Sequence, residues 1–234
     1  MDTQSTMPAA PPATSNELPL VSVRQFVLFP GSVLPILAER PGREAVLQEA
    51  ARTSGTIAVV LQRDPKDDLP SFSGLYPIGV EARLLRYVTA RDGTHHAIVQ
   101  GIGRIRLLDM VDGTEPRAVR VERIAEPNDT STDIEARFLQ LRDRALETLG
   151  LLEQAPPELA GAVQAIDSPG QLADMVASLM DITPAEKQDV LETIPLLGRL
   201  DRVLWKLAHR LEVLRLSADI GKRTRETMEG RQRE

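Results

Sequence analysis

Histidines are the side chains in this sequence best suited to bind a metal ion, because the chain contains no cysteine. His95 and His96 are adjacent, and His209 is distant in the sequence. A zinc site needs three or four protein ligands, so this set does not predict one. The lack of cysteine also excludes disulfides and thiolate metal sites. We expect surface or hydrogen-bonded histidines and no metal in this chain.

A short acidic run, Asp64-Pro65-Lys66-Asp67-Asp68, contains paired carboxylates that could act as acid and base or bind Ca²⁺. The run lacks the alternating ligands and the glycine of a calcium-binding loop. We therefore interpret it as a solvated loop.

Phosphate binding and nucleophilic catalysis both lack their usual motifs. Gly221-Lys222-Arg223-Thr224 is the nearest approach to a P-loop, but it has no glycine five residues upstream and no preceding strand. There is no Gly-x-Ser-x-Gly elbow. None of the lysines lies near a serine in an apolar setting that would suit a Ser-Lys dyad. We predict no catalytic, cofactor-binding or metal-binding residues, so this chain alone is not expected to be an enzyme.

The composition is that of a soluble chain with an aliphatic core. The 234 residues suit one large or two small domains, and 42% are apolar although only 3% are aromatic. The net charge of −6 makes nucleic acid an unlikely partner. No apolar run approaches the roughly 20 residues that span a bilayer, and the N-terminus does not resemble a signal peptide. We expect a cytoplasmic protein that does not enter a membrane.

Strand signals dominate residues 18–126, after a Pro- and Ala-rich segment at residues 1–17 that we interpret as a disordered tail. Residues 55–61 form a β-branched apolar run, and apolar residues alternate from Ile78 to Leu84. The alternation slips at Leu84-Leu85, which suggests a β-bulge. Further strands are expected at residues 97–101, at 105–108, and around Val119 and Val121, with a helix from about Pro41 to Arg52. Asp92-Gly93 predicts a hairpin turn.

Helix signals follow a break at residues 127–131. Three hydroxyl residues, each followed three positions later by Glu or Gln, fit capping boxes: Thr132, Ser168 and Thr183. A final helix begins near Pro195 and carries one apolar stripe from Leu196 to Leu214. The distal third of this helix has little to bury. We therefore predict an α+β fold: a twisted, partly closed sheet with one helix (residues 18–126), a helical bundle (132–194) and a long helix (195–234).

Several segments resemble the N-terminal domain of Lon proteases. Leu18-Pro19-Leu20-Val21-Ser22-Val23-Arg24 followed by Phe26-Val27-Leu28-Phe29-Pro30-Gly31 resembles the opening of that domain. Its central hairpin is similar to Gly79-Val80-Glu81-Ala82 and Gly101-Ile102-Gly103-Arg104-Ile105-Arg106. The order and spacing of these segments are specific, although no single one is. Gln25 stands where the family usually has Asp, so any role of that carboxylate does not transfer.

The resemblance implies a function. Lon is a hexameric, ATP-driven serine protease (endopeptidase La) that degrades misfolded and regulatory proteins, and its N-terminal region helps to capture substrates and stabilise the ring. By this resemblance we expect a non-catalytic substrate-recognition region, truncated before the ATPase and peptidase domains. ATP and Mg²⁺ would bind only in those domains. The expected partners are unfolded, damaged or degron-bearing proteins and further copies of the chain. Alternatives are a structural or oligomerisation spacer and a standalone Lon-domain binding protein.

The predicted hairpin also contains the candidate residues for substrate contact: Leu85, Tyr87 and Val88. If Leu85 and Tyr87 occupy the outer face of the sheet, they form an exposed apolar spot that could hold a segment of an unfolded chain. The alternative is that Tyr87 packs between the β half and the first helices.

Overall fold

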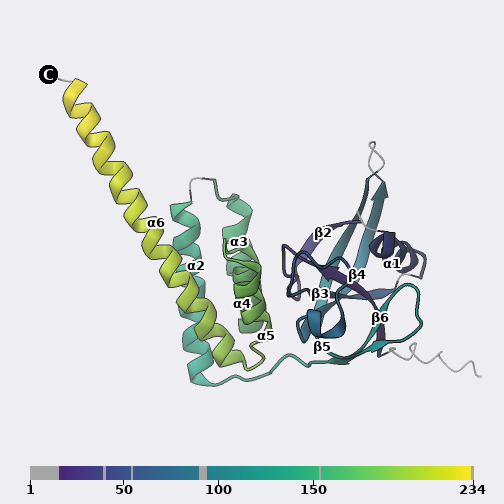
Figure 1. Cartoon of the computed structure of the whole chain (residues 1–234). Coiled ribbons are helices and arrows are strands. Elements are labelled where there is room, and N and C mark those ends of the chain that lie inside the picture. Colours follow the sequence, from purple (N-terminus) through teal and green to yellow (C-terminus); the bar gives the residue numbers. More distant parts are fainter. Residues whose placement is uncertain (1–15, 39–40, 54, 90–93, 153, 233–234) are drawn as a thin grey trace, which may run out of the picture.

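The computed structural model describes residues 16–38, 41–53, 55–89, 94–152 and 154–232. A β-rich half precedes a helical half (Figure 1). The strands of the β half are β1 (Glu17–Val23), β2 (Val33–Leu37), β3 (Thr56–Leu61), β4 (Ile78–Thr89), β5 (His95–Val111) and β6 (Ala118–Arg123). Helix α1 (Pro41–Thr53) and a short 3-10 turn (Phe72–Gly74) interrupt them. The helical half contains α2 (Thr132–Leu151), α3 (Pro157–Ala165), α4 (Pro169–Leu179), α5 (Pro184–Glu192) and α6 (Leu196–Gln232).

Five of the six strands form a closed ring of pairings. The sheet order is β2-β5-β4-β3-β1-β6, and β6 pairs with β5 as well as with β1. The β1–β3 pairing is parallel, whereas the other pairings are antiparallel. Strand β5 is long enough to pair with β4, β2 and β6, so β2 lies beside the ring rather than in it. The predicted partly closed sheet is therefore present.

The ring separates two apolar clusters, because successive side chains of a strand point to opposite faces. One cluster consists of strand residues plus Leu75, and we assign it to the interior of the ring. Its members are Leu18, Leu20, Ala58, Val60, Leu75, Ile105, Leu107, Val119 and Val121. The other, larger cluster contains the opposite face of the strands, the buried residues of α1, and the helical half. One core thus continues across both halves.

Glycines allow two close approaches within the β half. A Cβ atom on Gly101 would lie 2.2 Å from the backbone oxygen of Phe29, and one on Gly79 would lie 2.8 Å from that of Val59. By contrast, a Cβ on Gly103 would meet nothing within 4 Å. The segment before β2 can pack on β5 only because position 101 has no side chain.

Helix caps define the starts of α4 and α5. The Ser168 side chain accepts a hydrogen bond from the Gln171 backbone N–H at 3.4 Å. Thr183 and Glu186 form a complete capping box. The capping box predicted at Thr132 was wrong: α2 has Ser131 as its N-cap, without a side-chain hydrogen bond. Thr132 is already the first helical residue, so its hydroxyl does not cap the helix.

Helix α6 is 37 residues long, which corresponds to about 55 Å. Its N-terminal half packs on α2 and α4, and it then extends past the ends of the other helices (Figure 1). The predicted apolar stripe is buried from Leu196 through Leu211, and Leu214 is half-buried. No helix in the described part of the chain is long and apolar enough to cross a bilayer.

Buried charges join the two halves. Arg104 of β5 donates two hydrogen bonds to the Asp174 carboxylate of α4, at 2.8 and 2.6 Å, and a third to the Leu191 carbonyl at 2.9 Å. Arg199 of α6 donates to Glu126 at 2.8 Å and lies 3.6 Å from Asp174. Side chains of Arg104, Asp174 and Arg199 are at most 3% exposed. We call these four charged residues the interdomain latch.

The structure corrects the predicted element list in three places. Residues 97–101 and 105–108 belong to the single strand β5, which bulges at Ile102 and Leu108 instead of breaking. Strand β2 and helix α3 were not predicted. The predicted bulge near Leu84-Leu85 is confirmed by a register shift between Leu84 and Arg86. The predicted Asp92-Gly93 turn and most of the predicted disordered tail lie outside the described residues.

Candidate functional site

An exposed face of strands β4, β5 and β2 is the candidate functional site. The register aligns three rows of side chains across the strands on the face opposite α1. The rows, each read from β4 through β5 to β2, are Arg83–Gln100–Val33, Arg86–Ile98–Pro35 and Val88–His96–Leu37. Leu85 is the extra residue of the bulge between the first two rows. We call these ten residues the outer face.

Apolar side chains on the outer face are open to solvent. Val33 and Leu85 are each 50% exposed, Leu37 is 41% exposed and Val88 is 37% exposed. They come from two strands that β5 holds side by side, with the half-buried Ile98 between them. Single exposed apolar residues are common on proteins, but a contiguous apolar patch is typical of an interaction surface.

Two of the three predicted contact residues lie on this face. Leu85 and Val88 point outward, but Tyr87 does not, so the condition that placed Leu85 and Tyr87 together on the outer face is not met. The bulge adds one residue to β4 and so reverses the alternation, which places Tyr87 opposite Ala97 on the inner face. Tyr87 is half-buried against the main core and stacks on His95 with a centroid distance of 5.5 Å. Tyr87 therefore packs between the β4–β5 hairpin and the main core.

The outer edge of β2 is poorly suited to accept another strand. Ala38 donates its N–H to the His95 carbonyl at 2.9 Å, so the register directs the backbone groups of Leu34 and Ile36 toward β5 as well. The backbone groups of Val33, Pro35 and Leu37 therefore face the other side. Pro35 has no N–H there, and Arg43 donates to the Leu37 carbonyl at 3.0 Å. Ligands would therefore use the side chains of the outer face rather than the β2 backbone.

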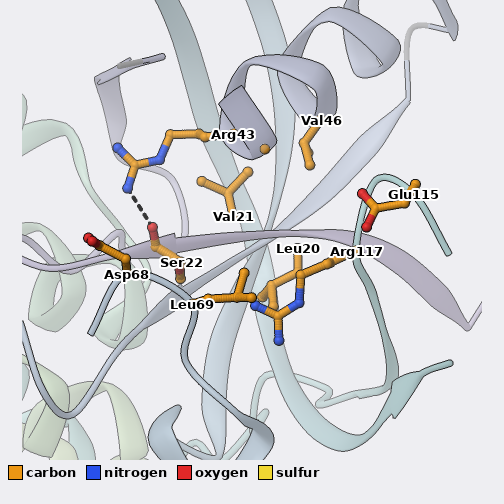
Figure 2. Close-up of a pocket in the computed structure, with 10 residues that line it drawn as sticks. Leu20, Val21, Ser22, Arg43, Val46, Asp68, Leu69, Glu115 and Arg117 are labelled. Carbon is orange, nitrogen blue, oxygen red and sulfur yellow. Dashed lines mark hydrogen bonds between the residues drawn. The ribbon is translucent and has the colours of Figure 1, made fainter. Parts of the chain in front are cut away.

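Figure 2 shows a separate cavity of about 410 Å³ between β1, α1 and the loops near residues 68 and 115. Three of its four charged residues have partners, and the fourth is Glu115. Arg43 donates to the Ser22 carbonyl at 2.7 Å, Arg117 donates to the Pro70 carbonyl at 2.8 Å, and Asp68 accepts from Arg24. These bonds hold loops against the ring, so we interpret the cavity as a consequence of loop packing.

Histidines and acidic residues lie where simple structural roles suffice. His95 contacts Thr89 and Glu44, and His96 contacts Thr94. In the acidic run, the Asp64 and Asp67 side chains accept backbone N–H groups within their own loop. Across the described residues, no group of three or more His, Asp or Glu side chains is placed to hold a metal ion.

One lysine has an altered acidity and a serine nearby. Burial lowers the pKa of Lys187. Its Nζ atom donates to the backbone carbonyl of Ser178 at 2.7 Å, whereas the Ser178 hydroxyl donates to the Met175 carbonyl at 2.8 Å. Lysine and hydroxyl are therefore not paired as nucleophile and base. Lys187 instead binds the C-terminal end of α4.

The outer face has a neighbouring groove that sequence reasoning did not find. A cavity of about 470 Å³ lies between residues 30–34 and the helical half, and Val33 belongs to both. Its other apolar lining residues are Leu34, Leu159, Ile166, Met175 and Leu179. Strand β2 and helix α3 contribute to this lining, and neither element was predicted. Val33 and Leu37 were not predicted as site residues because they lie on β2, which was not predicted as a strand.

Comparisons with known proteins agree on the family. The model of the ATP-dependent protease La (LON) substrate-binding domain matches residues 17–209. A Lon protease of Methylocella silvestris is 47% identical over 219 residues, which cover 94% of this chain and 27% of that protein. A Lon protease of Paraburkholderia phytofirmans is 46% identical over 228 residues, with 95% and 28% covered. The chain thus spans about a quarter of the length of these relatives.

Solved structures show the same fold. The N-terminal domain of a Lon protease from the Mycobacterium avium complex matches with a TM-score of 0.68 at 24% identity, covering 82% of this chain and 97% of that one. A Lon N-terminal domain protein from Xanthomonas campestris matches with a TM-score of 0.59 at 17% identity, covering 80% and 96%. Together with the family match over most of its length, these likenesses show that the chain belongs to the LON substrate-binding domain family.

Proposed function

We propose that this chain captures protein substrates for a Lon-type protease and that the outer face is where it holds them. The observation that carries this proposal is the apolar patch of Val33, Leu37, Leu85 and Val88, exposed on a rigid, hydrogen-bonded sheet. Folded proteins bury such side chains, whereas unfolded chains expose them. A solvent-open apolar surface therefore selects for the unfolded state without reading a specific sequence.

Binding to this face would depend on a few anchors. A well-packed anchor residue in a protein interface contributes roughly 1–2 kcal/mol or more. Leu85 is half exposed and, as the extra residue of the bulge, lies outside the paired rows. Its loss should weaken an unfolded ligand about five- to thirtyfold, which is the same range of free energy.

The experiment compares Leu85→Ser with Leu108→Ser. Both leucines are 50% exposed and both are bulge residues, but Leu108 lies on β5 where it pairs with β6, away from the outer face. Binding of a labelled, permanently unfolded model protein is measured by fluorescence anisotropy. We expect Leu85→Ser to weaken binding and Leu108→Ser to leave it unchanged, with equal melting temperatures. Equal binding by both variants would contradict the proposal.

The wider setting is part of the same proposal. The similarity to Lon proteases supports the proposal that the intact protein is an ATP-dependent serine endopeptidase. In it, ATP and Mg²⁺ would bind outside the residues described above, and this chain would contribute recognition of unfolded or degron-bearing proteins. We place the protein in the cytoplasm as a homo-oligomer, a hexamer by the family resemblance.

A second candidate function is assembly through α6. Trp205, Val213 and Leu216 are 71%, 44% and 58% exposed, and their spacing places them on one side of the helix, away from the buried stripe. A partner helix could cover this second stripe in an oligomer. Sedimentation velocity at increasing concentration tests the idea. We expect association that Trp205→Ser weakens and that Leu139→Ser, at an exposed leucine of α2, leaves unchanged.

A further inference from the structure

Two arginines give the outer face a positive charge next to its apolar residues. Arg83 and Arg86 lie in the first two rows, beside Leu85, and both are exposed. Within the described part of the chain, neither forms a hydrogen bond or an ion pair. Other exposed arginines of the β half do have partners: Arg106 binds Glu122 and Arg120 binds Glu17.

Among the described residues of the outer face, no carboxylate balances these cations. The three rows and Leu85 contain no Asp or Glu. The next acidic residue along β4 is Glu81, which is buried and bound by Arg123 and Thr56. Burial alone would raise the pKa of Glu81, but the hydrogen bonds from Arg123 and Thr56 outweigh it and lower the pKa. Glu81 is therefore ionised and already committed to other partners. The outer face is locally cationic although the whole chain carries a net charge of −6.

We propose that the outer face prefers extended apolar segments that carry a carboxylate close to their apolar residues. This inference rests on the proposed function and adds a substrate class to it. An arginine guanidinium beside an apolar patch can bind a carboxylate through two parallel hydrogen bonds. Arg83 and Arg86 pair with Gln100 and Ile98, which are two residues apart on β5, so the two arginines are spaced roughly 7 Å along the sheet. A bound segment that crosses the patch would therefore pass both cations.

Charge also decides which segments bind poorly. A lysine or arginine next to the apolar residues would meet two like charges within about one screening length, which is about 8 Å at physiological ionic strength. Acidic-apolar segments are favoured over basic-apolar segments even when their hydrophobicity is equal.

The test uses three labelled peptides with identical apolar residues and either two Asp, two Asn or two Lys at the same positions. Binding to the full 234-residue chain is measured by fluorescence anisotropy at low and high salt. We expect the Asp peptide to bind about two- to fivefold more tightly than the Asn peptide for each arginine that it engages, and the Lys peptide to bind weakest. Raising the salt concentration should remove most of this difference.

Two variants test whether Arg83 and Arg86 cause the preference for acidic peptides. The double variant Arg83→Gln with Arg86→Gln should bind the three peptides equally. The control double variant Arg106→Gln with Arg120→Gln, which removes the same two positive charges elsewhere on the β half, should keep the ranking. Equal binding of the three peptides by the unsubstituted chain would overturn the charge preference but leave the proposed function standing. A ranking that survives in the double variant would also overturn it. Failure of all three peptides to bind would instead reject the proposed function.

Discussion

Asp174 is the residue whose loss should damage this structure most through electrostatics alone. Its carboxylate accepts two of the three hydrogen bonds that the Arg104 guanidinium donates, and it lies 3.6 Å from Arg199. Asp174→Ala would leave two buried arginines with Glu126 as their nearest carboxylate, and that side chain is 46% exposed. Both cations would remain shielded from water without adequate compensation.

The expected cost follows from that geometry. Each hydrogen bond to a charged group contributes about 1.5–3 kcal/mol, and Asp174 accepts two of them. Removing one partner of a buried ion pair typically costs about 3–5 kcal/mol, which agrees with that sum. A surface pair provides the scale for comparison: Asp201 binds Arg137 at 2.9 Å with both side chains exposed to solvent. Losing that exposed pair should change the stability far less, because solvent screens it.

The assay is urea unfolding of Asp174→Ala and the control Asp201→Ala, followed by two probes. Far-UV circular dichroism reports on the whole chain, and pulsed hydrogen exchange of the amides of α2 and α4 reports on the helical half. We expect a fall of about 3–5 kcal/mol for Asp174→Ala. We also expect its two probes to separate, because the interdomain latch couples the halves. A loss below about 1 kcal/mol with coincident transitions would refute the reasoning.

Three further changes test local features. Gly101→Ala should destabilise by about 3 kcal/mol or more because its Cβ would collide with the Phe29 carbonyl, whereas Gly103→Ala should be nearly neutral; thermal melts of both decide. The backbone and side-chain hydrogen bonds of the capping box lower the pKa of Glu186 from 4.5 to about 2. Its contribution to stability is therefore complete above pH 4.5 and lost as the pH falls toward 2. Glu186→Gln should cost about 1 kcal/mol at pH 7, given its exposure, and almost nothing near pH 2; denaturant titrations at both pH values would show a constant difference if this is wrong. Pro35→Val should restore an outward N–H on β2 and cause concentration-dependent association, which light scattering would detect.

Much of the fold could be predicted from local patterns in the sequence. The apolar run of β3, the alternating apolar residues of β4 and the stripe of α6 are local patterns, and each predicted an element at its observed place. Strand β2 was missed because it is short and contains Pro35, which argues against a strand unless the strand lies at an edge. Helix α3 was missed because Pro156 is its N-cap and makes no side-chain hydrogen bond, so no capping signal precedes it.

The site was only partly predictable because it depends on pairing between distant segments. Leu85 and Val88 could be named from β4 alone, but Val33 and Leu37 join them only through β5. The inner position of Tyr87 could not be predicted, because the sequence showed a slip at Leu84-Leu85 but not which residue is the extra one. The interdomain latch could not be predicted, because Arg104 and Asp174 are 70 residues apart and the resemblance of the segment around Arg104 gave that arginine no partner.

Ring closure has a consequence for the synthesis of the chain. Strand β1 is made well before its antiparallel partner β6, which ends at Arg123, about 100 residues after β1. At typical translation rates this interval lasts roughly 5–20 s. During that time Leu18 and Leu20, which are later sealed inside the ring, have no β6 side chains to cover them. The domain that we propose to recognise unfolded chains is therefore itself an unfolded chain during its synthesis. Its nascent form exposes apolar segments of the kind that cellular chaperones bind.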